Sequence, residues 1–340
     1  MKHPAWCCCE RGRLRSLRLP RIVAVADSRV KISQHLGANM AATTLVGRLL
    51  CASASSYSVV KGETVLDPEL AVPYYDGVGY LEPPAAFLAG ADDINSCTVG
   101  TTNDGVVVAF RGTLSLDGPF TIPKLIDWVN DFNAAPAKWD TGTGDVHDGF
   151  LGSLNSLWAV VRDEAKRQLQ ASGKQLLITG HSKGGSVAAL AAMRFFEKEN
   201  INPKVVTFAA AKAGNTVFAD KYNSAIDHTR YEFADDIVPH LPPSAPFIEA
   251  LHSLSFFSRR LQGLQDFDYG RLGNLLYIKR SMEIIPDPDN SLLDQRRKSI
   301  LKTILLGHIQ QVGDDHRIAC GYGYMTSLCP AGVCPVPMNS

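Results

Sequence analysis

The chain has 340 residues, of which 45% are hydrophobic, so it can bury the core of one large α/β domain or of two smaller ones. Lys plus Arg and Asp plus Glu are equal at 34 each, so no overall charge draws it to nucleic acid or to an anionic surface. No run reaches the roughly 18 consecutive apolar residues that a membrane-spanning helix needs. We therefore expect a globular protein without an integral membrane segment.

Residues 1–39 are rich in arginine and lack the continuous apolar core of a secretory signal. We expect them to be a disordered extension, either an organelle transit peptide or sequence ahead of a start at Met40, and we expect a cytoplasmic protein. The eight cysteines have irregular spacing and no CxxC pair, which favours reduced thiols over zinc or a disulfide framework. The run Cys7-Cys8-Cys9 is either acylated or part of a disordered tail.

Predicted strands and helices alternate from about residue 97 onward, the pattern of a mostly parallel sheet covered by helices. The first two strands, 97–102 and 105–110, form a hairpin around Asn103-Asp104-Gly105, because an Asp-Gly pair accepts positive φ. The later elements, in chain order, are a helix over 150–171, a strand over 175–180, a helix over 186–196, strands over 204–210 and 229–234, and a helix over 301–311 with Leu305 facing inward. They predict one α/β domain over residues 40–340, although 250–295 shows no clear pattern.

The pentapeptide Gly180-His181-Ser182-Lys183-Gly184 lies between a predicted strand and a predicted helix. Glycines two before and two after the serine let strand and helix approach closely, which forces the serine into a strained turn with its hydroxyl exposed. The helix N-terminus favours negative charge, so the Lys183 amide could stabilise an oxyanion beside Ser182. A phosphate-binding loop is excluded, because its lysine would have to follow the second glycine.

Motifs spread along the chain resemble those of the class 3 (fungal-type) lipases, which are α/β-hydrolases. The resemblance covers roughly residues 50–325 and consists of VVVAFRGT, DWVNDF, VHDGF, LITGHSKGG, VTFAAAKAGN, DDIVPHLPP and DHRIACGYGY, in the order of the family. Two departures stand out. Lys183 replaces the apolar or amide residue common after the serine, and alanines replace a Gly and a Pro in VTFAAAKAGN.

The resemblance implies a catalytic triad of Ser182, Asp236 and His316. Asp236 opens the D-x-V-P turn after a strand, with Asp235 as the alternative acid. His316 lies late in the chain before a segment of glycines and tyrosines, with His308 in the helix 301–311 as the alternative base. The order Ser, Asp, His is the order that α/β-hydrolases use.

The resemblance also implies an oxyanion hole and a lid. The amide and hydroxyl of Thr113 would join the Lys183 amide in the hole, and Arg111 would brace the loop. The lid would cover about residues 114–127, with Gly118, Pro119 and Pro123 delimiting it. Its apolar side chains would cover the acyl pocket when closed and contact lipid when open; they are Leu114, Leu116, Phe120 and Ile122.

The function implied is hydrolysis of carboxylic esters, as a lipase acting on acylglycerols or other lipid esters through an acyl-enzyme on Ser182. A thioesterase or peptidase would share the triad, and a catalytically idle lipase-like module that binds lipid or a partner is the alternative outside enzymes. An acyltransferase is disfavoured, because no histidine has an aspartate five positions later. Neither a metal nor a nucleotide cofactor is implied, since H-E-x-x-H is absent and the triad needs neither. The expected partner is a lipid substrate at a membrane or droplet surface, and nucleic acid is not expected.

Overall fold

The computed structural model describes residues 42, 44–60, 65–66, 74–113, 120–253, 261, 263–318 and 321–326. The predicted N-terminal extension 1–39, the cysteine run at 7–9 and the lid residues Leu114 and Leu116 lie outside this set.

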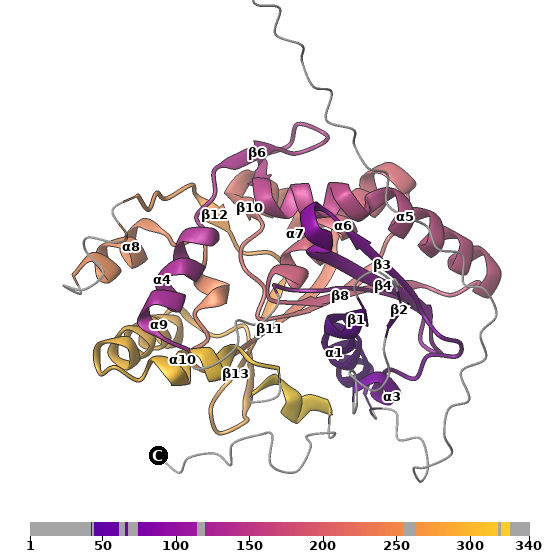
Figure 1. The fold of residues 1–340 in the computed structure, drawn as a ribbon. Coiled ribbons are helices and arrows are strands. Elements are labelled where there is room, and N and C mark those ends of the chain that lie inside the picture. The colour runs from indigo at the N-terminus through magenta and orange to yellow at the C-terminus, as the bar shows by residue number, and fades with distance from the viewer. Residues whose placement is uncertain are drawn as a thin grey trace, which may run out of the picture.

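An eight-stranded sheet forms the centre of the molecule, in the order β14-β13-β11-β9-β8-β5-β4-β3 (Figure 1). Its central strands from β5 to β13 run parallel to their neighbours, whereas β3, β4 and β14 pair antiparallel. The mostly parallel sheet predicted from the sequence is confirmed. The strands are β3 (Ala85–Ala89), β4 (Asn95–Thr101), β5 (Val106–Phe110), β8 (Leu176–His181), β9 (Lys204–Phe208), β11 (Asp227–Phe233), β13 (Asn274–Ile278) and β14 (Ile284–Pro286).

Helices cover both faces of this sheet (Figure 1). Because side chains alternate along a strand, Val106, Val108 and Phe110 of β5 join one hydrophobic core with helices α5 (Asp148–Ser172) and α6 (Lys183–Glu199). The alternate residues Val107 and Ala109 join a second core with α1 (Leu45–Ser55) on the opposite face. The strands between these layers are buried on both sides, as expected for a parallel sheet.

A smaller antiparallel sheet and further helices adjoin the central sheet. The small sheet has the order β12-β10-β7-β6, from β6 (Pro136–Lys138), β7 (Asp145–His147), β10 (Gly214–Asn215) and β12 (Tyr269–Gly270). Figure 1 shows α4, α8, α9 and α10 gathered on one side of the molecule. The remaining elements are β1 (Val59–Val60), β2 (Val65–Leu66), α3 (Tyr74–Val78), α4 (Ile122–Asp131), α7 (Thr216–Ala225), α8 (Ala245–His252), α9 (Asn290–Leu305), α10 (Ile309–His316), and short 3-10 turns at Ser56–Ser58, Ala91–Asp93, Val238–His240 and Tyr322–Thr326.

The predicted helix over 301–311 is wrong, because the chain breaks between α9 and α10. Gly307 adopts φ +77 at the break, a backbone conformation that a helix interior does not contain. Leu305, predicted to face inward, is 62% exposed at the end of α9. His308 precedes α10 and is exposed as well.

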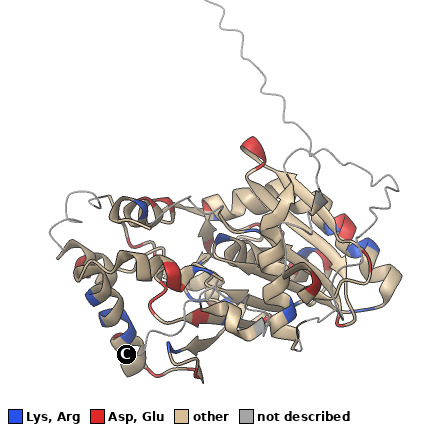
Figure 2. Cartoon of the chain, turned by 60° about the horizontal axis from the view of Figure 1, so that its bottom comes forward, with Lys and Arg blue, Asp and Glu red and all other residues tan. Residues whose placement is uncertain are grey.

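Three general features concern the described residues. Cys51 and Cys97 are free and buried. No helix in this part of the chain combines the length and hydrophobicity that crossing a membrane would require. The cartoon in Figure 2 shows the positions of Lys and Arg interspersed with those of Asp and Glu, in keeping with the equal numbers of basic and acidic residues.

Candidate active site

Ser182 lies in a sharp turn between β8 and α6, as the glycine pattern predicts. Its backbone has φ 59 and ψ −133, a sparsely populated conformation for a residue with a side chain. A Cβ atom at Gly180 would come within 2.3 Å of the Gly184 backbone, and one at Gly184 within 2.2 Å of the Phe110 carbonyl oxygen. Both glycines are therefore required for α6 to pack so close to β5 and β8, which is what presents the Ser182 hydroxyl at the end of the sheet.

The structure brings Ser182, His316 and Asp236 together. The Ser182 hydroxyl lies 2.9 Å from His316 Nε2, and His316 Nδ1 lies 3.0 Å and 3.1 Å from the two carboxylate oxygens of Asp236. Asp236 is fully buried, and the other two residues are nearly so. Because a carboxylate can only accept, Nδ1 carries the proton and Nε2 is free to accept the serine proton.

The alternative acid and base lie outside this arrangement. The Asp235 carboxylate accepts hydrogen bonds from Ser299 at 3.1 Å and from Thr303 at 3.2 Å, both on α9. Its backbone amide donates to Asp315 at 3.1 Å. His308 is exposed at the junction of α9 and α10. Neither Asp235 nor His308 hydrogen-bonds to a triad residue.

Two further donors fix the Asp236 carboxylate. The Tyr322 hydroxyl donates to Asp236 Oδ2 at 2.7 Å, and the Val238 amide donates to Oδ1 at 3.0 Å. The same Tyr322 oxygen accepts the Phe233 amide at 2.9 Å, and burial raises the pKa of the phenol well above its usual value, so it stays protonated as a donor. Tyr322 was not predicted as a site residue, although it lies in the segment of glycines and tyrosines after His316.

We expect Tyr322→Phe to lower both stability and activity. The Phe233 amide and one Asp236 oxygen would lose a buried partner, which costs about 1–3 kcal/mol of the free energy of unfolding. A rise of about 1.4 kcal/mol in the activation free energy of the reaction would lower kcat about tenfold. Urea denaturation and ester hydrolysis measure the two effects. Tyr324→Phe, at a side chain that is 57% exposed, is the matched control and should change neither.

Arg296 of α9 stabilises the turn that carries Asp236. This side chain has no solvent exposure, and it donates to the carbonyl oxygens of Ala234 at 2.9 Å and Asp236 at 3.2 Å. It also forms an ion pair with Glu232. Burial opposes ionisation of Glu232, but Arg296 and Arg230 outweigh it and lower the pKa of the carboxyl, so the pair stays charged.

His181, the residue before Ser182, connects the end of β8 to the end of α10 through a hydrogen bond. Its Nε2 donates to the His316 carbonyl oxygen at 2.8 Å, which leaves Nδ1 to accept from the Tyr57 hydroxyl at 3.1 Å. Burial and the neighbouring His316 lower the pKa of His181 well below its usual value, so the ring is neutral. His181 and Tyr57 therefore position the backbone of the base, and sequence reasoning assigned neither of them a role.

The loop after β5 passes beside the nucleophile. A Cβ atom at Gly112 would lie 3.2 Å from the Cβ of Ser182, so the backbone of the loop passes close to this serine. Thr113, the next residue, is exposed. Arg111 braces the loop, as expected, by donating to the carbonyl oxygens of Asp93 at 3.1 Å and Ile94 at 3.0 Å. The loop that carries Thr113 thus approaches Ser182 closely at Gly112.

Lys183 begins α6 beside the nucleophile. Its amide is the first N–H group of α6, a position that has no carbonyl partner within the helix. Its ammonium donates to the Asn95 side chain at 2.8 Å, and burial, with a contribution from Arg111, lowers the pKa of Lys183 to about 8. The Lys183 side chain is thus half-buried and engaged with Asn95.

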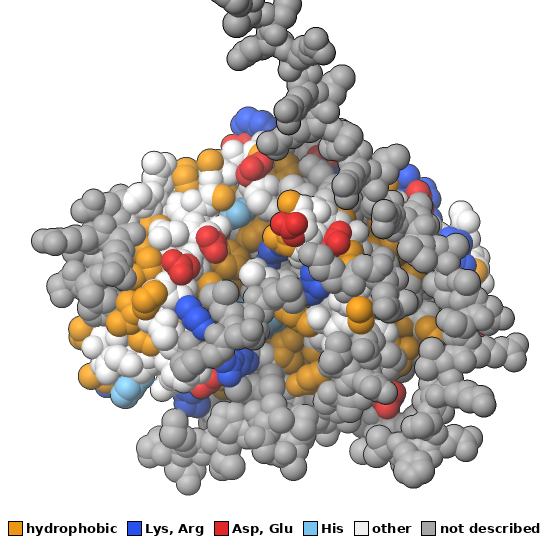
Figure 3. Space-filling model, viewed as in Figure 1, with side chains coloured by type: hydrophobic (Ala, Val, Ile, Leu, Met, Phe, Trp, Pro, Cys, Tyr) orange, Lys and Arg blue, Asp and Glu red, His pale blue; other side chains and the backbone are white. Residues whose placement is uncertain are grey.

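Helix α4 begins within the expected lid segment 114–127 and continues beyond it to Asp131. Its Trp128 ring, one residue past that segment, lies 4.9 Å from the His316 ring and 4.7 Å from the Phe120 ring, centroid to centroid. The Phe120 amide donates to Gln310 of α10 at 2.8 Å. Ile122, the first residue of α4, is half-buried. Hydrophobic side chains reach the surface at several places on this side of the molecule (Figure 3).

Comparison with known proteins agrees with this fold and geometry. Residues 107–245 match the family model described as Lipase (class 3). The chain is 31% identical over 156 residues to a lipase of Rhizomucor miehei, and 31% identical over 158 residues to the secreted mono- and diacylglycerol lipase A of Penicillium cyclopium. These matches cover 43% and 44% of this chain, and 40% and 47% of the relatives. The chain thus matches less than half the length of these curated relatives.

Solved structures extend the likeness in fold. The native propeptide complex of Rhizomucor miehei lipase superposes with a TM-score of 0.57 at 21% identity, covering 84% of this chain and 81% of that one. A triacylglycerol lipase structure superposes with a TM-score of 0.58 at 22% identity, covering 84% and 96%. The sheet, its helical layers and the strand-to-helix turn define an α/β-hydrolase fold. Within that class, residues 107–245 are similar to the class 3 lipases.

Proposed function

We propose that the protein is a serine carboxylic-ester hydrolase, a lipase that acts on acylglycerols or related lipid esters. The observation that carries the proposal is the arrangement of Ser182, His316 and Asp236 at 2.9–3.1 Å with the acid fully buried. The names of similar proteins support the substrate class. One relative is called a mono- and diacylglycerol lipase, and one similar structure is described as a triacylglycerol lipase whose catalytic centre is a serine protease triad.

The geometry supports acyl transfer in two steps. Ser182 attacks the ester carbonyl carbon while its proton passes to His316 Nε2, and Asp236 stabilises the imidazolium. The negative charge that develops on the carbonyl oxygen is stabilised by the Thr113 and Lys183 amides. Collapse of the tetrahedral intermediate breaks the bond to the alcohol, which takes the proton from His316. Water then attacks the acyl-enzyme while His316 takes its proton. The bond to Ser182 breaks, the serine regains a proton from His316, and the fatty acid is released.

We further propose that residues 40–340 act as one α/β-hydrolase unit whose lid spans about residues 114–127. The Trp128 ring, directly after this span, packs edge-on against His316, and Phe120 packs against Trp128. Because Ser182 is only 5% exposed, a lipid ester would have to displace this cover to reach the nucleophile. The natural place for that displacement is a membrane or droplet surface, because lid opening would exchange buried apolar area for contact with lipid.

Covalent labelling tests the proposal directly. We expect a fluorophosphonate probe to label the wild type with one adduct per chain on Ser182, and we expect Ser182→Ala to remain unlabelled. Ser186→Ala, at the buried serine one helical turn further on, is the control that should keep the label. Hydrolysis of p-nitrophenyl esters, triacylglycerols and phospholipids then separates lipases from other acyl hydrolases. A folded wild type that takes no label would overturn the proposal.

The lid gives a separate prediction. Activity should rise disproportionately when the substrate concentration crosses the critical micelle concentration, because an interface favours the open lid. Trp128→Ala should weaken this dependence, since the ring covering His316 would be missing. Initial rates measured across the micelle threshold provide the test. A rate that stays proportional to monomer concentration through the threshold would exclude the lid.

A further inference from the structure

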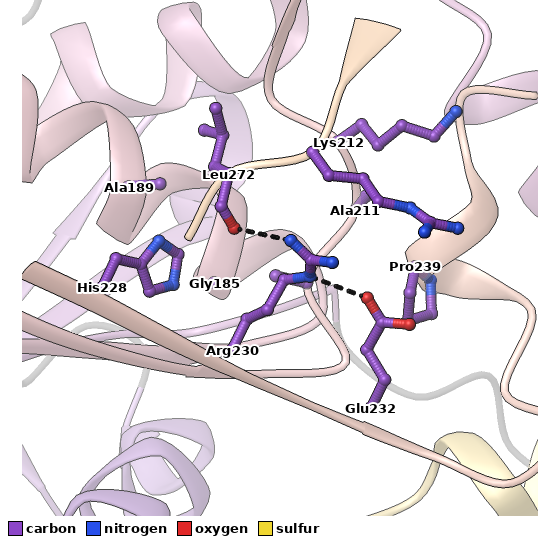
Figure 4. Close-up of a pocket in the computed structure, with 11 residues that line it drawn as sticks. Gly185, Ala189, Ala211, Lys212, His228, Arg230, Glu232, Pro239 and Leu272 are labelled. Carbon is purple, nitrogen blue, oxygen red and sulfur yellow. Dashed lines mark hydrogen bonds and ion pairs between the residues drawn. The ribbon is translucent and has the colours of Figure 1, made fainter. Parts of the chain in front are cut away.

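A small cavity lies on the α6 side of the central sheet, apart from the triad (Figure 4). It has a volume of about 20 Å³ and is enclosed by α6, by the segment after β9, by β11 and by the residues before β13. On β11, Tyr231 and Phe233 join the core beneath the sheet, whereas the alternate residues Arg230 and Glu232 line the cavity. Helix α6 and strand β11 therefore form part of the cavity wall, together with the connecting segments.

The lining is strongly basic. Lys212, Arg230 and Arg271 border the cavity, against one acidic residue, Glu232. Both Glu232 oxygens are already engaged, one by Arg230 Nε at 2.9 Å and the other by Arg296. The Arg230 side chain also donates to the carbonyl oxygens of Leu272 at 3.2 Å and Gly273 at 2.7 Å (Figure 4). Among the lining residues, three cations therefore stand against one carboxylate. Asp266 and Asp268 also act on Lys212 by raising its pKa, but neither forms a close ion pair with it in the described part of the chain.

Several donors at this site lack a partner. Within the described part of the chain, neither the Lys212 ammonium nor the Arg271 guanidinium forms a side-chain hydrogen bond or a close ion pair with another residue. Burial, with a contribution from Arg271, lowers the pKa of Lys212 to about 8. Nearby, His240 Nε2 is buried with no hydrogen-bond partner among these residues. Lys212 and Arg271 are half-buried, so unpaired cationic donors border a water-sized space in which an anion would supply the acceptor that they lack.

We propose that this cavity binds a small inorganic anion of the size of chloride, between Lys212, Arg230 and Arg271. The volume is sufficient for a water-sized species and too small for a phosphate or a carboxylic acid. An anion accepts hydrogen bonds from all its neighbours and offsets the repulsion among the cations, whereas a water molecule accepts only two bonds and brings no charge. Glu232 keeps its ion pairs with Arg230 and Arg296, and Arg296 holds the turn that carries Asp236.

Anion-dependent stability tests the site. At constant ionic strength, replacing sodium gluconate by sodium chloride should raise the Tm of the wild type saturably, by about 2–4 °C for a modest excess of chloride over its Kd. Lys212→Met and Arg271→Gln should each lose the chloride-specific part of the shift. Lys204→Met removes a more exposed cation on β9 and should retain it. Equal Tm values in the two salts, or a shift that survives in both cavity variants, would overturn the proposal.

A second measurement does not depend on variants that fold. Crystals of the wild type soaked in sodium bromide should show an anomalous peak between Lys212, Arg230 and Arg271. Bromide peaks confined to the outer surface, with none in the cavity, would contradict the site.

Discussion

His316→Ala is expected to lower kcat for ester hydrolysis by about 10⁶-fold, and Ser182→Ala to lower it by a similar factor. The nucleophile and base lie 2.9 Å apart and act as one unit, so removing either abolishes attack. For the same reason, the double variant should lose no more than either single variant. The rates are measured with a soluble p-nitrophenyl ester, with circular dichroism to show that the fold is retained.

His308→Ala is the matched control for this prediction. His308 was the alternative base in the sequence, but it is exposed between α9 and α10, so its removal should leave kcat within about twofold. The assignment of the base would be wrong if His316→Ala kept a tenth of the activity, or if His308→Ala lost as much as Ser182→Ala.

Arg296→Met is expected to lower the free energy of unfolding by about 3–5 kcal/mol, the usual cost of removing one partner from a buried ion pair. The methionine fills part of the space but leaves Glu232 with a single arginine, and it leaves the Ala234 and Asp236 carbonyl oxygens without their donor. Activity should fall too, because the turn carrying the acid loses its support. Urea denaturation measures the loss as a lower midpoint with an unchanged slope.

The adjacent Arg297 provides the comparison. It forms an ion pair with Asp294 on the exposed side of α9, so Arg297→Met should cost about 0–1 kcal/mol. Equal effects at positions 296 and 297 would show that burial of the charged pair does not determine the stability of this turn.

The parts of the site that the sequence predicts are those encoded locally. Gly180 and Gly184 flank the serine because any larger residue would collide with neighbouring backbone. Five consecutive residues therefore determine the turn. The strands are predictable for a similar reason, since β-branched runs bounded by turn residues need no distant information. The α/β-hydrolase fold was therefore predicted correctly from these patterns and the family's motifs.

The supporting residues could not be predicted, because their roles depend on contacts between distant parts of the chain. Arg296 precedes Arg297 and Lys298, and this run of basic residues is typical of a solvated helix face, yet Arg296 is buried behind Asp236. Tyr322 acts on a carboxylate 86 positions earlier. The break at Gly307 was missed because leucines and isoleucines continue with helical spacing across it.

The hydrogen bonds of His316 and Tyr322 place the completion of the proposed site at the end of synthesis. A nascent chain that has left the ribosome as far as β11 contains most strands of the central sheet and the turn at Ser182, but it has neither His316 nor the tyrosine that donates to Asp236. Under the proposed function, we therefore expect such a chain to be inactive. Competence for hydrolysis would arrive only when α10 and the turn at Tyr322–Thr326 dock against the sheet.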